Sequence, residues 1–248
     1  MKTIYIMWLR QLKRYWRSKS RIFASISQPL LFLFAFGLGF GPIYSQAGQG
    51  DYLSFLGPGI VSMAILFSSI MNGMETIWDK QFGFLKETLV APVSRTKIML
   101  GRTLGGATLS VIQGLIVLFF IFLFGMKIVS VQSFVFSLFF MILIAVFFTA
   151  LGITIASKLD DMHAFPLIMN FLIMPVFFLS GALFPLNNFP SWIQAIVKFN
   201  PMVYGVDAIR GTLTGQFVVG LFLDTIILIP IVIIIIFLGA YTFSKIEI

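Results

Sequence analysis

Cysteine is absent from the sequence, so the chain can hold neither a disulfide nor a thiolate metal site. Three motifs that would hydrolyse nucleotide, peptide or ester bonds are absent as well: GxxxxGK followed by Ser or Thr, HExxH and GxSxG. We therefore expect a chain that is not an enzyme on its own and that binds no cofactor itself.

Charged residues are scarce: they make up 10% of the chain, against 59% hydrophobic residues. A soluble domain carries about 25% charged residues, so the composition, with a mean hydropathy of +1.02, indicates an all-α integral membrane protein. Charges are almost missing from the centres of the apolar segments, where a self-contained channel or ion-coupled carrier would more often bury them. The net charge of +8 follows membrane topology, so we expect no nucleic-acid partner.

Six apolar segments are long enough to cross a bilayer as helices, within a single membrane domain over residues 1–248. They span residues 22–41, 55–75, 103–125, 131–156, 164–184 and 221–243. Pro58 is expected in the first turn of its helix, where proline is tolerated. A GxxxG pattern from Gly37 to Gly41 is weak support for helix packing in the first segment.

Residues 1–21 contain seven Lys and Arg and no acidic residue. Trp8, Tyr15 and Trp16 interleave with these charges at helical spacing, which predicts a basic amphipathic helix lying on an anionic membrane surface among its lipids. Of the 17 Lys and Arg in the chain, 14 fall on the side of the membrane where the predicted topology places the N-terminus, and 3 fall on the other side. Because basic residues concentrate on the cytoplasmic side, both termini are predicted to be cytoplasmic.

A polar segment over residues 82–97 lies between the second and third apolar segments, on the predicted cytoplasmic side. Phe82, Leu85 and Leu89 lie at i, i+3 and i+7, which gives one apolar stripe before Pro92 ends the helix. A stripe two turns long fits a helix that offers its polar face to a partner, and it fits a solvated loop about equally well.

Two places near the predicted membrane boundaries carry acidic residues that could have a function. Glu75 could be a relay or an interfacial carboxylate that reaches water, and we favour the interfacial interpretation. Asp160, Asp161 and His163 give too few converging ligands for a metal, so no metal site is expected.

Residues 185–220 are too polar and broken to span a membrane, which predicts short interfacial or re-entrant helices on the outside. Asp207 and Arg210, at i and i+3, are expected to form a local ion pair.

Two sequence blocks resemble type-2 ABC exporter permeases, especially the daunorubicin-resistance-like branch. The first runs from Asp79 to Arg95 and is followed by Gly101 and Arg102. The second comprises Leu179 to Leu186, Pro190 to Trp192, and Asn200-Pro201 followed by Tyr204, Asp207 and Arg210. The resemblance covers essentially the whole chain.

The resemblance implies a permease in the cell membrane that pairs with a second copy or a paralogue. A separate ATP-binding cassette subunit, which would hold ATP and Mg, would dock on residues 82–97 as a coupling helix and drive efflux, including multidrug efflux. The docking residues would be Phe82, Phe84, Leu85, Lys86, Glu87, Leu89, Pro92 and Arg95. The external signature would be Gly181, Phe184, Pro185, Trp192, Asn200, Pro201, Tyr204, Asp207 and Arg210.

The substrate route would lie between the two permeases, lined mainly by the helices at 55–75 and 164–184. An amphipathic drug, a lipid and a lipid-linked glycan fit the apolar helices equally well. An ATP-independent channel or carrier, and a membrane anchoring subunit, remain as alternatives.

Overall fold

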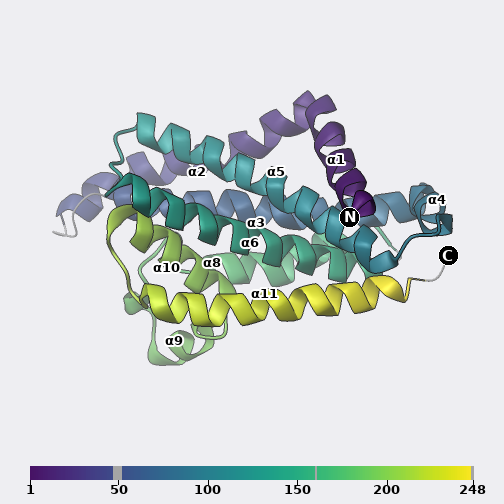
Figure 1. Ribbon diagram of the computed structural model, residues 1–248. Helices are drawn as coiled ribbons and strands as arrows, with labels where there is room; N and C mark the ends of the chain where they lie inside the picture. The colour runs from purple at the N-terminus through teal and green to yellow at the C-terminus, as the bar shows by residue number, and fades with distance from the viewer. Residues whose placement is uncertain (47–51, 160, 247–248) are drawn as a thin grey trace.

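The computed structural model describes residues 1–46, 52–159 and 161–246, and these form helices joined by short links (Figure 1). The order along the chain is α1 (Lys2–Arg17), α2 (Lys19–Gln46), α3 (Tyr52–Gln81), α4 (Phe84–Val90), α5 (Arg95–Leu123), α6 (Val131–Lys158), α7 (Ala164–Ile168), the π-helical turn η1 (Met169–Ile173), α8 (Met174–Phe178), the 3₁₀ turn η2 (Leu186–Asn188), α9 (Ser191–Val197), α10 (Pro201–Thr214) and α11 (Leu221–Ser244).

Five of the described helices are long and apolar enough to cross a membrane: α2, α3, α5, α6 and α11. The helix expected over 164–184 is shorter, since α7, η1 and α8 together run only from Ala164 to Phe178. At 1.5 Å per residue this stretch is about 22 Å long, less than the roughly 30 Å of a hydrocarbon core. The predicted helix was too long at its C-terminal end, because the chain leaves the helix after Phe178 and turns through Gly181, whose φ is +76°.

Helix α3 occupies the centre of the bundle. In its most apolar part 83% of the residues are buried, against 11% for α2 and 22% for α11, which lie at the periphery. Glycines allow backbones to approach closely: a Cβ on Gly73 would lie 2.4 Å from the carbonyl carbon of Gly152 in α6. Helix α3 begins at Tyr52, so Pro58 lies inside it and not in its first turn as expected.

Helix α1 packs along α5 at two glycines one turn apart. A Cβ on Gly101 would lie 2.7 Å from Met7 Cβ, and one on Gly105 would lie 2.7 Å from Gln11 Cβ. The Trp8 indole donates a hydrogen bond to Thr108 Oγ1 (3.1 Å). The other face of α1 stays exposed; its lying on a membrane surface remains a prediction.

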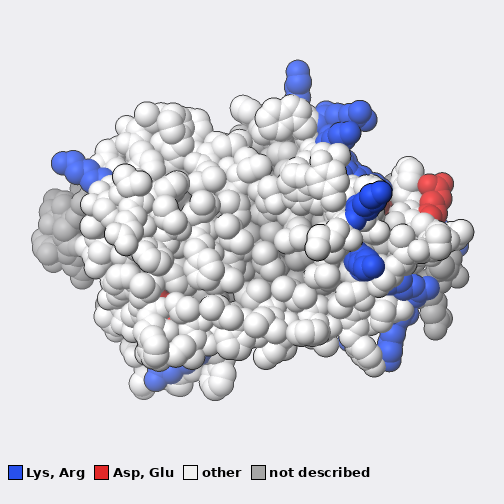
Figure 2. All heavy atoms as spheres, in the orientation of Figure 1, with Lys and Arg blue, Asp and Glu red and all other residues white. Residues whose placement is uncertain are grey.

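The segment expected outside the membrane divides into an exposed and a buried helix. Helix α9 exposes apolar side chains such as Trp192 and Ile196. In α10, 12 of 14 residues are buried, because it packs against α3, α6 and α11. Basic side chains gather at the end of the molecule where α1 and α4 lie, and the middle of the face in view is almost free of charge (Figure 2).

Candidate coupling surface and the charge cluster behind it

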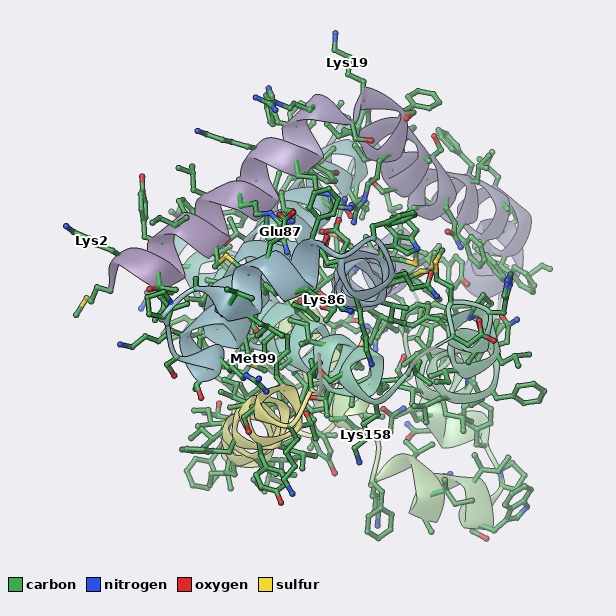
Figure 3. The ribbon with its side chains drawn as sticks, turned by 90° about the vertical axis from the view of Figure 1, so that its right-hand side faces the viewer. Lys2, Lys19, Lys86, Glu87, Met99 and Lys158 are labelled. Atoms are coloured by element: carbon green, nitrogen blue, oxygen red, sulfur yellow. The ribbon has the colours of Figure 1, made fainter. Side chains whose placement is uncertain are left out.

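Helix α4 lies at one end of the bundle, next to the end of α3, with Lys86 and Glu87 near the centre of the end-on view (Figure 3). Gly83 makes the turn between the two helices at a φ of +81°, a conformation that favours glycine. Lys86 and Glu87 are exposed, and Phe84 is 52% exposed. The short helix therefore exposes an aromatic ring and charges of both signs.

Leu85 is 1% exposed and belongs to the hydrophobic core, so it anchors α4 to its own chain. The prediction that Leu85 is a docking contact is therefore wrong; a two-turn stripe cannot tell which face turns inward. Leu89 is half-buried against the same core, whereas Phe82 and Pro92 are exposed beside α4.

Arg95 is occupied within the chain as well. Its Nη1 donates to the carbonyl oxygens of Ser244 (2.7 Å), the last residue of α11, and Ile246 (2.8 Å), just beyond it. The carbonyls at a helix C-terminus lack intrahelical partners, and a cationic side chain satisfies them well. Arg95 thus joins the start of α5 to the end of α11 and is not a free docking contact.

Behind this surface, Asp79 near the end of α3 is buried among three arginines. It accepts hydrogen bonds from Arg10 Nη1 (3.0 Å) and Arg14 Nη1 (3.0 Å) of α1 and from Arg102 Nη2 (2.6 Å) of α5. The side chains of Asp79 and Arg102 are each 1% exposed. A buried carboxylate needs such partners because water is excluded from it. Asp79 consequently ties α1, α3 and α5 together.

Glu75, one turn before Asp79, continues this cluster toward α2. One of its oxygens pairs with Arg21 Nη1, and Arg21 Nη2 donates to Asn72 Oδ1 (3.0 Å). The Asn72 amide in turn donates to the carbonyl of Gly106 (3.2 Å). Since the Glu75 side chain is only 3% exposed, the preferred interpretation of an interfacial carboxylate reaching water is wrong. Its role as a relay remains a prediction.

Sequence reasoning missed Asp79 and Arg102 as members of a site. A signal was present, because Glu75 and Asp79 lie at i and i+4 on one helical face. It also passed over Asp224 in the first turn of α11, which is fully buried; neither carboxylate oxygen has a hydrogen-bond partner within the described part of the chain.

At the other end of the bundle, Asp207 and Arg210 of α10 are buried and bond to backbone groups. Asp207 accepts hydrogen bonds from the amides of residues 218, 219 and 220 at 2.7, 2.8 and 3.1 Å. Arg210 donates to the carbonyls of Phe55 (3.2 Å) and Gly181 (2.8 Å). The described residues show no ion pair between Asp207 and Arg210, so that prediction is wrong: Asp207 bonds to the loop before α11, and Arg210 bonds to α3 and to the turn at Gly181.

Other signature residues shape the chain around α10. Asn200 caps α10, accepting from Met202 N (3.0 Å), and its amide donates to Val176 O (2.7 Å). The Tyr204 hydroxyl donates to Lys198 O (2.6 Å). The remaining members are Pro201 in the first turn of α10, Pro185 just before η2, Phe184 at 39% exposure and Trp192 at 66% exposure.

The described residues include no group of three or more His, Asp or Glu side chains that could hold a metal ion. Asp161 Oδ1 instead accepts a hydrogen bond from the backbone amide of His163 (2.8 Å). Asp160 lies outside the described residues.

The apolar helices, the basic end and the short exposed helix at that end define a multi-pass membrane protein. The chain belongs to the ABC-2 type transporter family, whose profile matches residues 2–214. It is a transport permease of the plasma membrane.

Relatives agree with this assignment. The chain is 33% identical to the transport permease ycf38 of Pyropia yezoensis over 81% of this chain and 70% of that protein. It is 25% identical to the inner membrane transport permease YadH of Escherichia coli K12, over 82% and 80%. It is 23% identical to nodulation protein J of Rhizobium leguminosarum bv. trifolii, over 87% and 80%. Permeases of this family normally work with an ATP-binding subunit.

Proposed function

We propose that this chain is the membrane subunit of an ATP-driven exporter and that α4 is where a separate ATP-binding subunit docks. The chain forms the substrate pathway together with a second permease, either a copy of itself or a paralogue. ATP and Mg bind to the partner subunit, and the cargo is an amphipathic compound such as a drug, a lipid or a lipid-linked glycan. One observation carries the proposal: α4 exposes Phe84, Lys86 and Glu87 while Leu85 anchors it to the core.

The contacts behind α4 support a mechanical link to the membrane helices. Helix α4 follows α3 after the turn at Gly83, and the same end of α3 holds Glu75 and Asp79. These carboxylates are bonded to arginines of α1, α2 and α5. A displacement of α4 by the ATPase therefore acts on four helices through α3.

The helices expected to line the pathway are neighbours. The rings of Phe67 in α3 and Phe177 in α8 lie 5.7 Å apart, centroid to centroid. The π-helical turn η1 precedes α8, and such turns are frequent at functional sites. This arrangement supports a route along α3 and α8.

The test is to purify the tagged chain from its native membrane in mild detergent and to identify its partners by native mass spectrometry. We expect two permeases with two ATPase subunits. Phe84→Ala should weaken ATPase association by about tenfold or more, as loss of an aromatic anchor does. Glu87→Arg should uncouple ATP hydrolysis from transport and leave the membrane fold intact, because the side chain is exposed.

Matched controls lie at the opposite end of the molecule. Phe199 is 87% exposed and Lys198 is exposed, so Phe199→Ala and Lys198→Glu make comparable changes away from α4. Neither should alter association or coupling. If coupled transport survives both Phe84→Ala and Glu87→Arg, α4 is not the docking site. If only this chain is recovered and it transports without ATP, the exporter assignment fails.

A further inference from the structure

A cavity of about 390 Å³ opens among α2, α3, α5 and the stretch from η1 to α8. Its volume lies in the range of small-molecule sites, about 300–1,000 Å³. Methionines from α3 and from the η1–α8 stretch line much of it: Met63, Met71, Met169 and Met174. Methionine is unbranched and adaptable, so this wall can follow an apolar chain of variable shape.

Arg21 of α2 also lines the cavity, next to the charge cluster. Its guanidinium contacts Glu75 and Asn72, so it is held in place. The cluster contains four arginines and two carboxylates, a surplus of two positive charges; the members are Arg10, Arg14, Arg21, Arg102, Glu75 and Asp79. An acidic group entering beside Arg21 would be attracted by that surplus.

Gln113 of α5 provides an independent observation. It lines the cavity and is 3% exposed. Its Nε2 donates to the Tyr15 hydroxyl (2.5 Å), but its Oε1 has no hydrogen-bond partner within the part of the chain that the structure describes. Buried acceptors without a partner are rare and costly. A hydroxyl or amide on a bound molecule would satisfy this oxygen.

We propose that the cavity binds one amphiphile with an acidic headgroup. An anionic oxygen of the headgroup lies beside Arg21, a hydroxyl or amide hydrogen of the same headgroup donates to Gln113 Oε1, and the apolar chain lies along the four methionines. The inference that the cavity holds the exported substrate rests on the proposed function. The inference that the cavity binds an acidic amphiphile does not. The ligand is either the cargo or a resident membrane lipid, and both share this chemistry.

The site can be tested without the ATPase. The permease is placed in discs of phosphatidylcholine and labelled with dodecyl phosphate that carries a photoreactive diazirine in its chain. Labelled peptides should cover residues 60–74 and 165–178. Unlabelled dodecyl phosphate should compete at least tenfold better than uncharged dodecanol. Labelling spread evenly over lipid-facing peptides would overturn the proposal.

Two variants separate charge from volume. Arg21→Met removes the charge beside the cavity. It should raise at least tenfold the concentration of dodecyl phosphate needed to compete with the probe, and it should leave the concentration of dodecanol needed unchanged. Arg17→Met removes an exposed arginine outside the cavity and should change neither. Because Arg21→Met also deprives Glu75 of its partner, Ala64→Phe provides a second test. Ala64 lines the cavity on α3, and its enlargement should reduce labelling by both charged and uncharged probes.

Equal effects of Arg21→Met and Arg17→Met, or full labelling of a folded Ala64→Phe variant, would overturn the site. The source of the ligand is decided in the complex with the ATPase. Labelling that falls on addition of ATP and Mg identifies a transported compound, whereas constant labelling in a complex that hydrolyses ATP identifies a resident lipid. Failure to isolate any ATPase would count against the proposed function and would leave the labelling result standing.

Discussion

The two ends of the bundle both bury charged side chains but satisfy them differently. Near α4, the carboxylate of Asp79 is bonded to arginine side chains from two other helices. Near α10, Asp207 bonds to three backbone amides, and Arg210 bonds to the backbone carbonyls of Phe55 and Gly181. The first end uses charge to join helices through pairs of side chains, and the second uses it to hold backbone groups, most of them in loops.

This difference determines what a substitution can undo. A pair of charged side chains can be replaced on both sides by neutral groups, which often restores stability. Where a charge bonds to backbone groups, replacing it leaves amides or carbonyls that no second substitution can remove. The helix-joining end also holds several arginines around two carboxylates, and it is the end where we propose that the ATPase acts.

The largest expected effect tests the helix-joining end. Asp79→Asn removes the only charge of opposite sign within hydrogen-bond distance of the buried Arg102 guanidinium among the described residues. Stranding a buried charge costs about 3–5 kcal/mol of unfolding free energy. Unfolding in mild detergent with increasing SDS, followed by tryptophan fluorescence, would measure it.

The double variant Asp79→Asn with Arg102→Met should recover most of that loss, because both charges are then gone. Glu87→Gln, which neutralises an exposed carboxylate at the same end, should change stability by less than about 0.5 kcal/mol. A loss below about 1 kcal/mol for Asp79→Asn alone would mean that the cluster does not hold the helices together.

A smaller effect is expected at the loop-fixing end. The two carboxylate oxygens of Asp207 accept hydrogen bonds from three backbone N–H groups, and Asp207→Asn replaces one of these oxygens by an amide nitrogen that cannot accept them. We expect a loss of about 2 kcal/mol in the same unfolding assay. Adding Arg210→Met should destabilise further, since Arg210 has backbone partners of its own. A rescue by Arg210→Met would show that the two side chains are coupled, and the contrast between the ends would collapse.

Several features were readable from the sequence because they depend on local pattern. Apolar length predicted the spanning helices α2, α3, α5, α6 and α11. The pattern in the segment 82–97 left a short helix and a solvated loop equally open, and the structure has the helix α4 there. The sequence could not show which face of that helix turns inward, so Leu85 was placed outside. Hydropathy predicted interfacial or re-entrant helices over 185–220, but it could not show that 12 of the 14 residues of α10 are buried.

The charge cluster lay beyond sequence reasoning for a different reason. Asp79 meets Arg10 and Arg14 across 69 and 65 residues, and only the packing of α1 on α5 brings them together. That packing uses Gly101 and Gly105, a GxxxG step in the polar start of α5. The step noticed in the sequence, Gly37 to Gly41, has nothing within 4 Å of a Cβ built at either glycine. Spacing alone does not tell which glycine pair packs against another helix of the same chain.

The smallest effect asks whether Arg95 belongs to the docking surface or to the fold. Arg95→Ala removes two hydrogen bonds to the carbonyls of Ser244 and Ile246 from a half-exposed guanidinium, so we expect a loss of about 0.5–1 kcal/mol. Hydrogen–deuterium exchange should become faster in the last turn of α11, and ATPase association should stay within about twofold of the wild type. Arg95→Lys keeps a donor and should restore part of the protection. If Arg95→Ala instead weakens ATPase association as much as Phe84→Ala and leaves exchange unchanged, Arg95 acts as a docking contact, and the joint between α5 and α11 does not depend on it.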